Sequence, residues 1–119
     1  MDDDGTVRTL AKLALERLGG CEVRALDGGS STLEEAASFR PDVVVLDVRL
    51  QGTDGVALMH AMRSLPELAA TPVVFCTALT GAGLGERLVR LGGFDVIFKP
   101  FLPRELVNKV RGAAGAGRP

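Results

Sequence analysis

The sequence predicts a doubly wound α/β domain, in which helices cover both faces of a parallel sheet. Three short runs rich in β-branched and aromatic residues, 43–46, 73–76 and 96–98, have the length of strands. Around them, apolar residues recur at the three- and four-residue spacing of amphipathic helices. Strands covered on both faces are typically continuous apolar runs, so this alternation indicates a parallel sheet between helical layers.

The first half of the chain predicts two helices and two strands. Apolar residues at helical spacing predict a helix over 6–18, which two glycines end. A short strand over 21–26 follows. Ser31 and Glu34 have the spacing of a capping box and begin a second helix, which ends before Pro41. The buried strand 43–46 comes next.

The second half repeats the strand and helix pattern up to a glycine-rich end. Helices are expected over 55–65 and 83–91, the latter weakened by glycines near its start. A last helix begins near Pro103, because proline suits the first turn. The glycine-rich segment 112–119 is interpreted as a flexible tail or linker stump, which leaves residues 1–111 as the domain.

Composition limits the function classes. The chain has 119 residues, the length of one domain, and 14 basic against 15 acidic residues give a net charge of −1. A protein that binds nucleic acid by neutralising phosphates should be more basic, so direct nucleic-acid binding is not expected. The two cysteines, Cys21 and Cys76, are too few for a disulfide scaffold and are expected to be reduced. No apolar stretch approaches the ~20 residues of a membrane span. A soluble, cytoplasmic protein is therefore expected.

Chemically useful side chains follow the predicted strands directly. Asp47, Thr77 and Lys99 each come after one of the buried runs, and Asp2 and Asp3 precede the first helix. The carboxyl ends of parallel strands meet at one edge of the sheet, where ligands bind in such folds. Each residue alone is more often a turn, cap or solvated residue, whereas together they indicate a site.

This set of groups suits one kind of chemistry. Clustered carboxylates suit a hard divalent ion such as Mg²⁺. A carboxylate beside that ion can attack phosphorus and form an aspartyl phosphate. An ammonium and a hydroxyl can then hold the phosphoryl oxygens, as phosphoryl transfer requires positioning and charge neutralisation.

The motifs resemble the receiver domains of two-component response regulators from Asp2 to about Val110. The resemblance rests on the spacing of these motifs along the chain: Asp2-Asp3 with Arg8, Val43-Val-Val-Leu-Asp47, Gly52-Thr-Asp-Gly55, Thr77-Ala78 and Lys99-Pro100-Phe101. It implies a flavodoxin-like (βα)5 fold and a signalling phosphoacceptor, whose only catalysis is its own phosphoryl transfer and autodephosphorylation.

The resemblance also implies a role for each site residue. Asp47 would accept a phosphoryl group from a histidine kinase or phosphotransfer protein. Asp2 and Asp3 would hold Mg²⁺ (or Mn²⁺) together with Asp47 and the backbone carbonyl of Arg49.

The remaining roles implied by the resemblance concern the switch and its output. Thr77 would move to meet the phosphoryl group, and Lys99 would pair with it, next to a Lys99–Pro100 bond that is typically cis in the family. The face formed by 83–91, 96–98 and the last helix would bind a downstream protein partner.

Four positions depart from the family pattern. Val96 stands where an aromatic residue usually reports phosphorylation, and Gln51 replaces a proline. Arg49 and Leu79 occupy positions that tend to tune the lifetime of the phosphoryl group. Arg49 could shield that group or simply be solvated.

The start of the chain departs further, because the family begins with a central strand that ends in the acidic pair. Here only Met1 precedes Asp2, so that strand is missing or truncated in this sequence. Loss of a central strand leaves backbone groups of both neighbours unpaired, at about 1–3 kcal/mol for each unsatisfied group. Repair is expected by pairing of 21–26 with 43–46, by strand exchange or by homodimerisation. An amino group at Met1 would compete with Mg²⁺ through its positive charge.

Two other functions remain possible from the sequence. A non-phosphorylated adaptor with the same fold is favoured by the short start and Val96, and opposed by the intact Asp47, Thr77 and Lys99. A metal-dependent phosphatase would need a second aspartate two residues after Asp47, where Arg49 stands.

Overall fold

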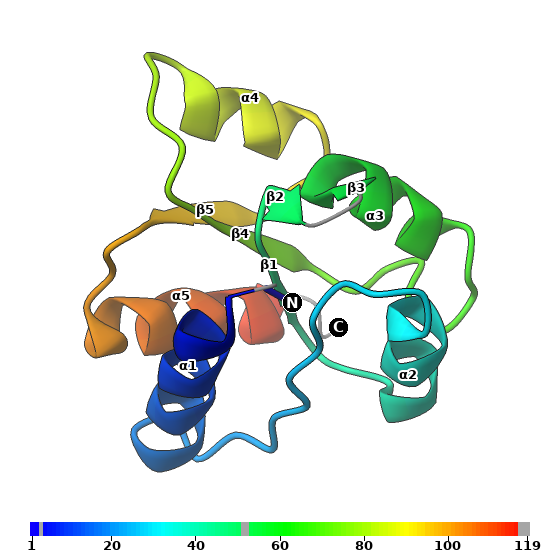
Figure 1. Cartoon of the computed structure of the whole chain (residues 1–119), viewed down its shortest axis with the longest axis horizontal. Coiled ribbons are helices and arrows are strands. Elements are labelled where there is room, and N and C mark those ends of the chain that lie inside the picture. The colour runs from blue at the N-terminus through cyan, green and yellow to red at the C-terminus, as the bar shows by residue number, and fades with distance from the viewer. Residues whose placement is uncertain (3, 51–52, 117–119) are drawn as a thin grey trace.

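The computed structural model describes residues 1–2, 4–50 and 53–116, which form five helices around a central parallel sheet (Figure 1). In chain order the elements are α1 (Gly5–Arg17), α2 (Thr32–Phe39), β1 (Val44–Leu46), β2 (Arg49–Leu50), β3 (Thr53–Asp54), α3 (Gly55–Arg63), β4 (Val73–Thr77), α4 (Leu84–Arg90), β5 (Asp95–Phe98) and α5 (Pro103–Ala116).

The sheet has the order β1-β4-β5, with both pairs parallel. β4 is the central strand, and all five of its residues are buried, as its continuous apolar run requires. The helices and these three strands confirm the elements expected from apolar spacing, apart from shifts of one or two residues at most ends. The two-residue strands β2 and β3, which form an antiparallel pair, were not expected.

Two apolar clusters lie on opposite faces of the sheet. Alternate β4 residues divide between them: Phe75 packs with α2, α3 and α4, whereas Val74 and Cys76 pack with α1 and α5. In Figure 1, α1 and α5 accordingly lie together on one side of the sheet, away from α2 and α3. This double cover is the flavodoxin-like α/β arrangement that the sequence predicts, and it leaves the carboxyl ends of the strands accessible.

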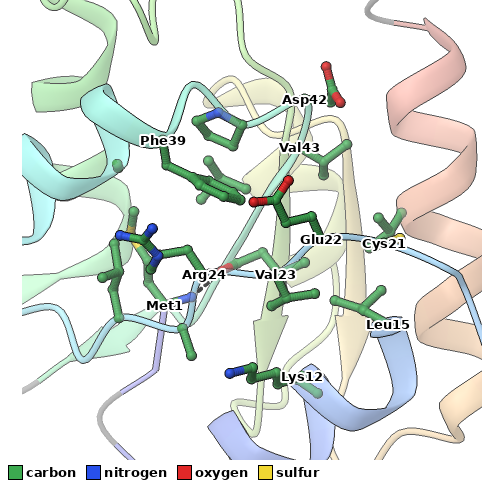
Figure 2. Close-up of a pocket in the computed structure, with 18 of the residues that line it drawn as sticks. Met1, Lys12, Leu15, Cys21, Glu22, Val23, Arg24, Phe39, Asp42 and Val43 are labelled. Carbon is green, nitrogen blue, oxygen red and sulfur yellow. Dashed lines mark hydrogen bonds between the residues drawn. The ribbon is translucent and has the colours of Figure 1, made fainter. Parts of the chain in front are cut away.

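The expected strand over 21–26 is wrong. These residues have no strand assignment, and they do not pair with β1 as the proposed repair required. A strand needs a hydrogen-bonded neighbour, and a groove of about 650 Å³ separates this segment from β1 (Figure 2). Met1 and Asp2 link the two segments at the carboxyl end of β1: Asp47 N–H donates to Met1 O (2.9 Å), and Asp2 N–H donates to Leu26 O (3.1 Å).

Two helix ends also differ from expectation. Ser31 is the N-cap of α2, but its hydroxyl does not accept the capping-box hydrogen bond expected from Glu34 N–H. The hydroxyl donates instead to the Glu35 carboxylate (3.3 Å). α5 continues through residues 112–116, which were expected to begin the tail, because Ala113 is buried against the sheet. Within the described residues, no helix is long and apolar enough to cross a membrane.

Candidate functional site

The carboxyl edge of the sheet brings an acid and a base together from its two outer strands. Asp47 directly follows β1, and Lys99 directly follows β5. The Lys99 ammonium donates to Asp47 Oδ2 (2.9 Å) and to Asp2 Oδ2 (2.6 Å), so one cation bridges two carboxylates from distant parts of the chain. The Lys99–Pro100 peptide bond is cis, as the resemblance implied.

Burial strengthens this ion-pair arrangement. Asp2 and Asp47 are only 6% and 7% exposed, so water screens their charges weakly. Burial of Lys99 on its own would lower the pKa of its ammonium. The hydrogen bonds and negative charges of Asp2 and Asp47 outweigh that effect and raise the pKa of Lys99 above its ordinary value. Lys99 therefore stays protonated and holds the two carboxylates together.

Asp2 is oriented by contacts that the sequence did not reveal. Its Oδ1 accepts a hydrogen bond from Asp4 N–H (2.9 Å), and its backbone carbonyl accepts one from Arg8 (2.7 Å). Asp4 in turn caps α1, because its carboxylate accepts from two first-turn amides. The sequence assigned no role to Arg8. The signal for it in the sequence is its place in the Asp2-Asp3 motif, six residues after Asp2.

The loop after Asp47 fixes the second carboxylate oxygen. Arg49 N–H donates to Asp47 Oδ1 (3.1 Å), while the Arg49 side chain is exposed. Gly55 packs against this loop so closely that a β-carbon there would lie 2.9 Å from the carbonyl carbon of Asp47 and 3.0 Å from Val48 Cα. The glycine of the Gly52–Gly55 motif nearest α3 thus permits the close approach that positions Asp47. Gln51 and Gly52 lie outside the described residues.

Thr77 lies at the same edge, and the hydrogen bonds described for it go to Leu79 and Lys99 and not to the carboxylates. It ends β4, is fully buried, and its backbone carbonyl accepts from Lys99 N–H (2.8 Å). Its hydroxyl oxygen accepts from Leu79 N–H (3.0 Å). Among the described residues no hydrogen bond joins Thr77 to Asp47. The structure therefore brings together Asp2, Asp47 and Lys99 and leaves Thr77 as their neighbour along the sheet.

Asp3, expected to hold metal with Asp2, lies outside the described residues. Within the described chain, no group of three or more acidic, histidine or cysteine residues is arranged to hold a metal ion. The Met1 amino group donates to Val45 O, and burial lowers its pKa to about 6. Burial thus opposes the positive charge that was expected to compete with Mg²⁺ at this position.

The comparisons with known proteins agree with this geometry. The family model for the response regulator receiver domain matches residues 1–111. Transcriptional regulatory protein CseB of Streptomyces coelicolor is 35% identical over 98% of this chain and 51% of its own length. ResD of Bacillus subtilis is 32% identical over 93% of this chain and 45% of its own length. The chain thus spans about half the length of these relatives.

Solved structures resemble this chain over nearly the whole length of both chains. A putative response regulator from Chloroflexus aurantiacus superposes with a TM-score of 0.85 at 33% identity, covering 97% of this chain and 93% of that one. The chemotaxis protein CheY4 of Vibrio cholerae gives a TM-score of 0.84 at 25% identity, covering 94% and 92%. With a matching family model over nearly all its length, the chain belongs to the response regulator receiver domains of two-component systems.

Proposed function

We propose that Asp47 is the phosphoacceptor of a two-component signalling protein, and that it takes the phosphoryl group from a histidine kinase or a phosphotransfer protein. The observation that carries the proposal is the Lys99 ammonium, which lies within hydrogen-bonding distance of both Asp47 and Asp2. A buried cation between two carboxylates supplies local positive charge where a phosphoryl group would arrive with negative charge. An ion pair with a purely structural role does not need a second, facing carboxylate.

The donor set fits a magnesium ion. Asp2 and Asp47 direct carboxylate oxygens at one point, since both reach Lys99 Nζ. Mg²⁺ is commonly held by one or two carboxylates together with water and phosphate oxygens. Asp2 and Asp47 would hold it, with Asp3 and the Arg49 carbonyl as the further ligands that the resemblance implies. When bound, the ion neutralises the phosphoryl oxygens as charge develops on them.

The transfer itself needs few protein groups. A carboxylate oxygen of Asp47 attacks phosphorus, the new P–O bond forms as the P–N bond of a phosphohistidine breaks, and the departing imidazole keeps the electron pair. Lys99 is already placed beside Asp47 and pairs with the transferred group. Arg49 N–H holds the other oxygen of the carboxylate and so orients it.

Thr77 is the group that would respond to phosphorylation. Its hydroxyl oxygen currently accepts a hydrogen bond, so its proton remains available to donate to a phosphoryl oxygen. Movement of Thr77 toward Asp47 would break the bond to Leu79 N–H and shift the start of the loop that leads to α4. Val96 is buried against Phe75, so a swinging aromatic ring at that position is not part of this switch.

The downstream partner would bind the face formed by α4, β5 and α5. Large apolar side chains on and beside these elements are exposed, among them Val89, Leu91, Phe94, Phe98 and Leu102. Exposed apolar groups gathered in one region mark protein interaction sites. Because this face adjoins the loop after Thr77, a phosphorylation-driven shift there would change how a partner binds.

Acetyl phosphate with Mg²⁺ tests the proposal. The parent protein should gain one phosphoryl group by intact mass, and Asp47→Asn should gain none. Asp54→Asn is the matched control: Asp54 caps α3, and asparagine caps a helix equally well, so this variant should be phosphorylated like the parent. Absence of an adduct on the folded parent protein would overturn the proposal and favour the adaptor function, in which the same fold binds partners without phosphorylation.

A further inference from the structure

Arg8 reaches back from the start of α1 to the acidic edge of the sheet. Its guanidinium nitrogen Nη1 donates to the backbone carbonyl of Asp2 at 2.7 Å, and the side chain is half-buried. The guanidinium lies beside Gly5, where a β-carbon would be 3.4 Å from Nη2. A glycine at the first position of the helix therefore keeps open the space that the guanidinium occupies next to Asp2.

The bond to the carbonyl leaves the carboxylate of the same residue free of Arg8. Asp2 Oδ1 accepts from Asp4 N–H (2.9 Å), and Oδ2 accepts from the Lys99 ammonium (2.6 Å). Within the described residues Arg8 forms no ion pair, so it occupies neither oxygen. An arginine bound directly to a carboxylate frequently takes both oxygens in a bidentate pair. Arg8 thus fixes the backbone of Asp2 and leaves its carboxylate to Lys99 and to an incoming cation.

Asp2 is therefore held at three points: its carbonyl and each of its two carboxylate oxygens. The Lys99 ammonium that binds Oδ2 also binds Asp47 Oδ2 (2.9 Å), so the two carboxylates are directed at one place. Groups that orient a metal ligand without touching the metal commonly contribute about 10- to 100-fold to metal affinity. Of the three contacts, the bond from Arg8 is the one that acts on the backbone from which the carboxylate extends.

We propose that Arg8 is the positioning residue for Asp2, and that its bond to the Asp2 carbonyl sets how tightly the site binds Mg²⁺. The inference rests on the magnesium site of the proposed function. In this role Arg8 contacts neither the metal nor the phosphoryl group. A purely electrostatic role of Arg8 predicts the opposite sign, because removal of a nearby positive charge favours the binding of a divalent cation.

Arg8→Met tests the proposal, because methionine keeps an unbranched apolar stem and removes the guanidinium. Mg²⁺ binding to the 119-residue protein is measured by isothermal titration calorimetry, at a temperature at which circular dichroism shows each variant folded. The dissociation constant for Mg²⁺ should rise at least about tenfold. Lys12→Met is the matched control. Lys12 carries the same charge, lies one turn further along α1 (Figure 2), and has an exposed side chain with no hydrogen bond or ion pair to the described residues. This variant should bind Mg²⁺ as tightly as the parent or slightly more tightly.

A second measurement needs no metal. Asp4 N–H donates to Asp2 Oδ1, so the proton chemical shift of this amide reports whether the carboxylate is held. NMR spectra without divalent ions should show the Asp4 amide shifted toward its random-coil value in Arg8→Met, and unchanged in Lys12→Met. The Leu18 amide, which is hydrogen-bonded at the far end of α1, should not shift in either variant.

Phosphorylation by acetyl phosphate separates metal binding from the chemical step. Arg8→Met should need more Mg²⁺ for the half-maximal rate and should reach nearly the parent rate at saturating Mg²⁺, since Arg8 contacts no reacting atom. An unchanged or lower dissociation constant for Mg²⁺, or an unmoved Asp4 amide, would overturn the proposal. A shift of the Leu18 amide would also overturn it, in favour of a role in holding α1 together. A parent protein that gains no phosphoryl group would overturn the proposed function, whereas the calorimetry and the Asp4 shift would still decide the role of Arg8.

Discussion

The two sides of β1 are built to different degrees of completeness. Toward β4, Val44, Val45 and Leu46 are in continuous parallel register with Val73, Val74 and Phe75. Toward residues 22–25, Met1 is the one residue of the described chain that pairs with the strand, at its carboxyl end. Asp2, Asp47 and Lys99 nevertheless converge at the carboxyl edge of the sheet. The contrast teaches that the site forms where strand ends meet and does not require β1 to be paired along both of its sides.

The largest difference should appear when apolar groups are removed from the two sides. Leu46 is fully buried, so Leu46→Ala should lower the free energy of unfolding by about 3 kcal/mol through lost burial and an unfilled cavity. Val23 lies on the groove and is only partly buried, so Val23→Ala should cost less than about 1 kcal/mol. Urea unfolding of both variants measures the two losses in the free energy of unfolding. Equal losses would mean that the groove wall is as tightly packed in solution as the β4 side.

A smaller effect is expected at the site itself. Lys99→Met removes the cation between Asp2 and Asp47 and should lower the free energy of unfolding by about 2 kcal/mol in the absence of divalent ions. The two carboxylates then face each other without a counter-charge. Mg²⁺ should therefore raise the melting temperature of this variant more than that of the parent, in which the ammonium already balances their charge.

Lys109→Met is the matched control for that comparison. Lys109 pairs with Asp95 at 3.1 Å, but both side chains are considerably exposed, at 29% and 40%. An exposed pair of this kind contributes about 0–1 kcal/mol, so the variant should be nearly as stable as the parent and no more responsive to Mg²⁺. If Lys99→Met behaved like Lys109→Met, the three-group cluster would not hold the edge of the sheet together.

Much of this architecture could be predicted from the sequence, because it depends on local patterns. Continuous β-branched runs gave strands at β1, β4 and β5, and the polar residues directly after them gave Asp47, Thr77 and Lys99. The two failures have different causes. Whether 21–26 forms a strand depends on a neighbouring strand that its own residues do not encode. Whether the Ser31 hydroxyl bonds Glu34 N–H or the Glu35 carboxylate depends on side-chain geometry within one turn.

The contacts between distant segments of the site were harder to predict than the identity of the residues that form it. The spacing placed Asp2 and Lys99 at one edge of the sheet, but that Lys99 bridges both carboxylates follows only from the folded geometry. The role of Arg8 was missed because its contact is with a backbone carbonyl, which carries no residue-type signal. Ala113 shows the opposite error: glycines around it predicted a tail, and burial of one small side chain kept the helix intact.

The smallest expected effect is a loss of stability at high pH that arises from the same cluster. The pKa of Lys99 is higher in the folded protein than its ordinary value of 10.5, so the folded state holds this proton more tightly than the unfolded chain does. The resulting stabilisation is fully present below the unfolded pKa and is lost as pH rises through the folded one. The free energy of unfolding of the parent should therefore fall above about pH 10.5, more steeply than that of Lys99→Met.

The Cys76 thiol also contributes to the loss of stability at high pH, and its contribution has to be separated from that of Lys99. Burial raises the pKa of its thiol from 9.0 to about 11, so its share of the loss begins at lower pH. Because the Lys99 charge itself lowers the pKa of the Cys76 thiol, this share does not cancel between the two proteins, and both curves are therefore measured in a Cys76→Ala background. A difference that stays constant from pH 9 to pH 12 would mean that the ammonium gains nothing from the two carboxylates, and the site edge would then be no better organised than the open flank.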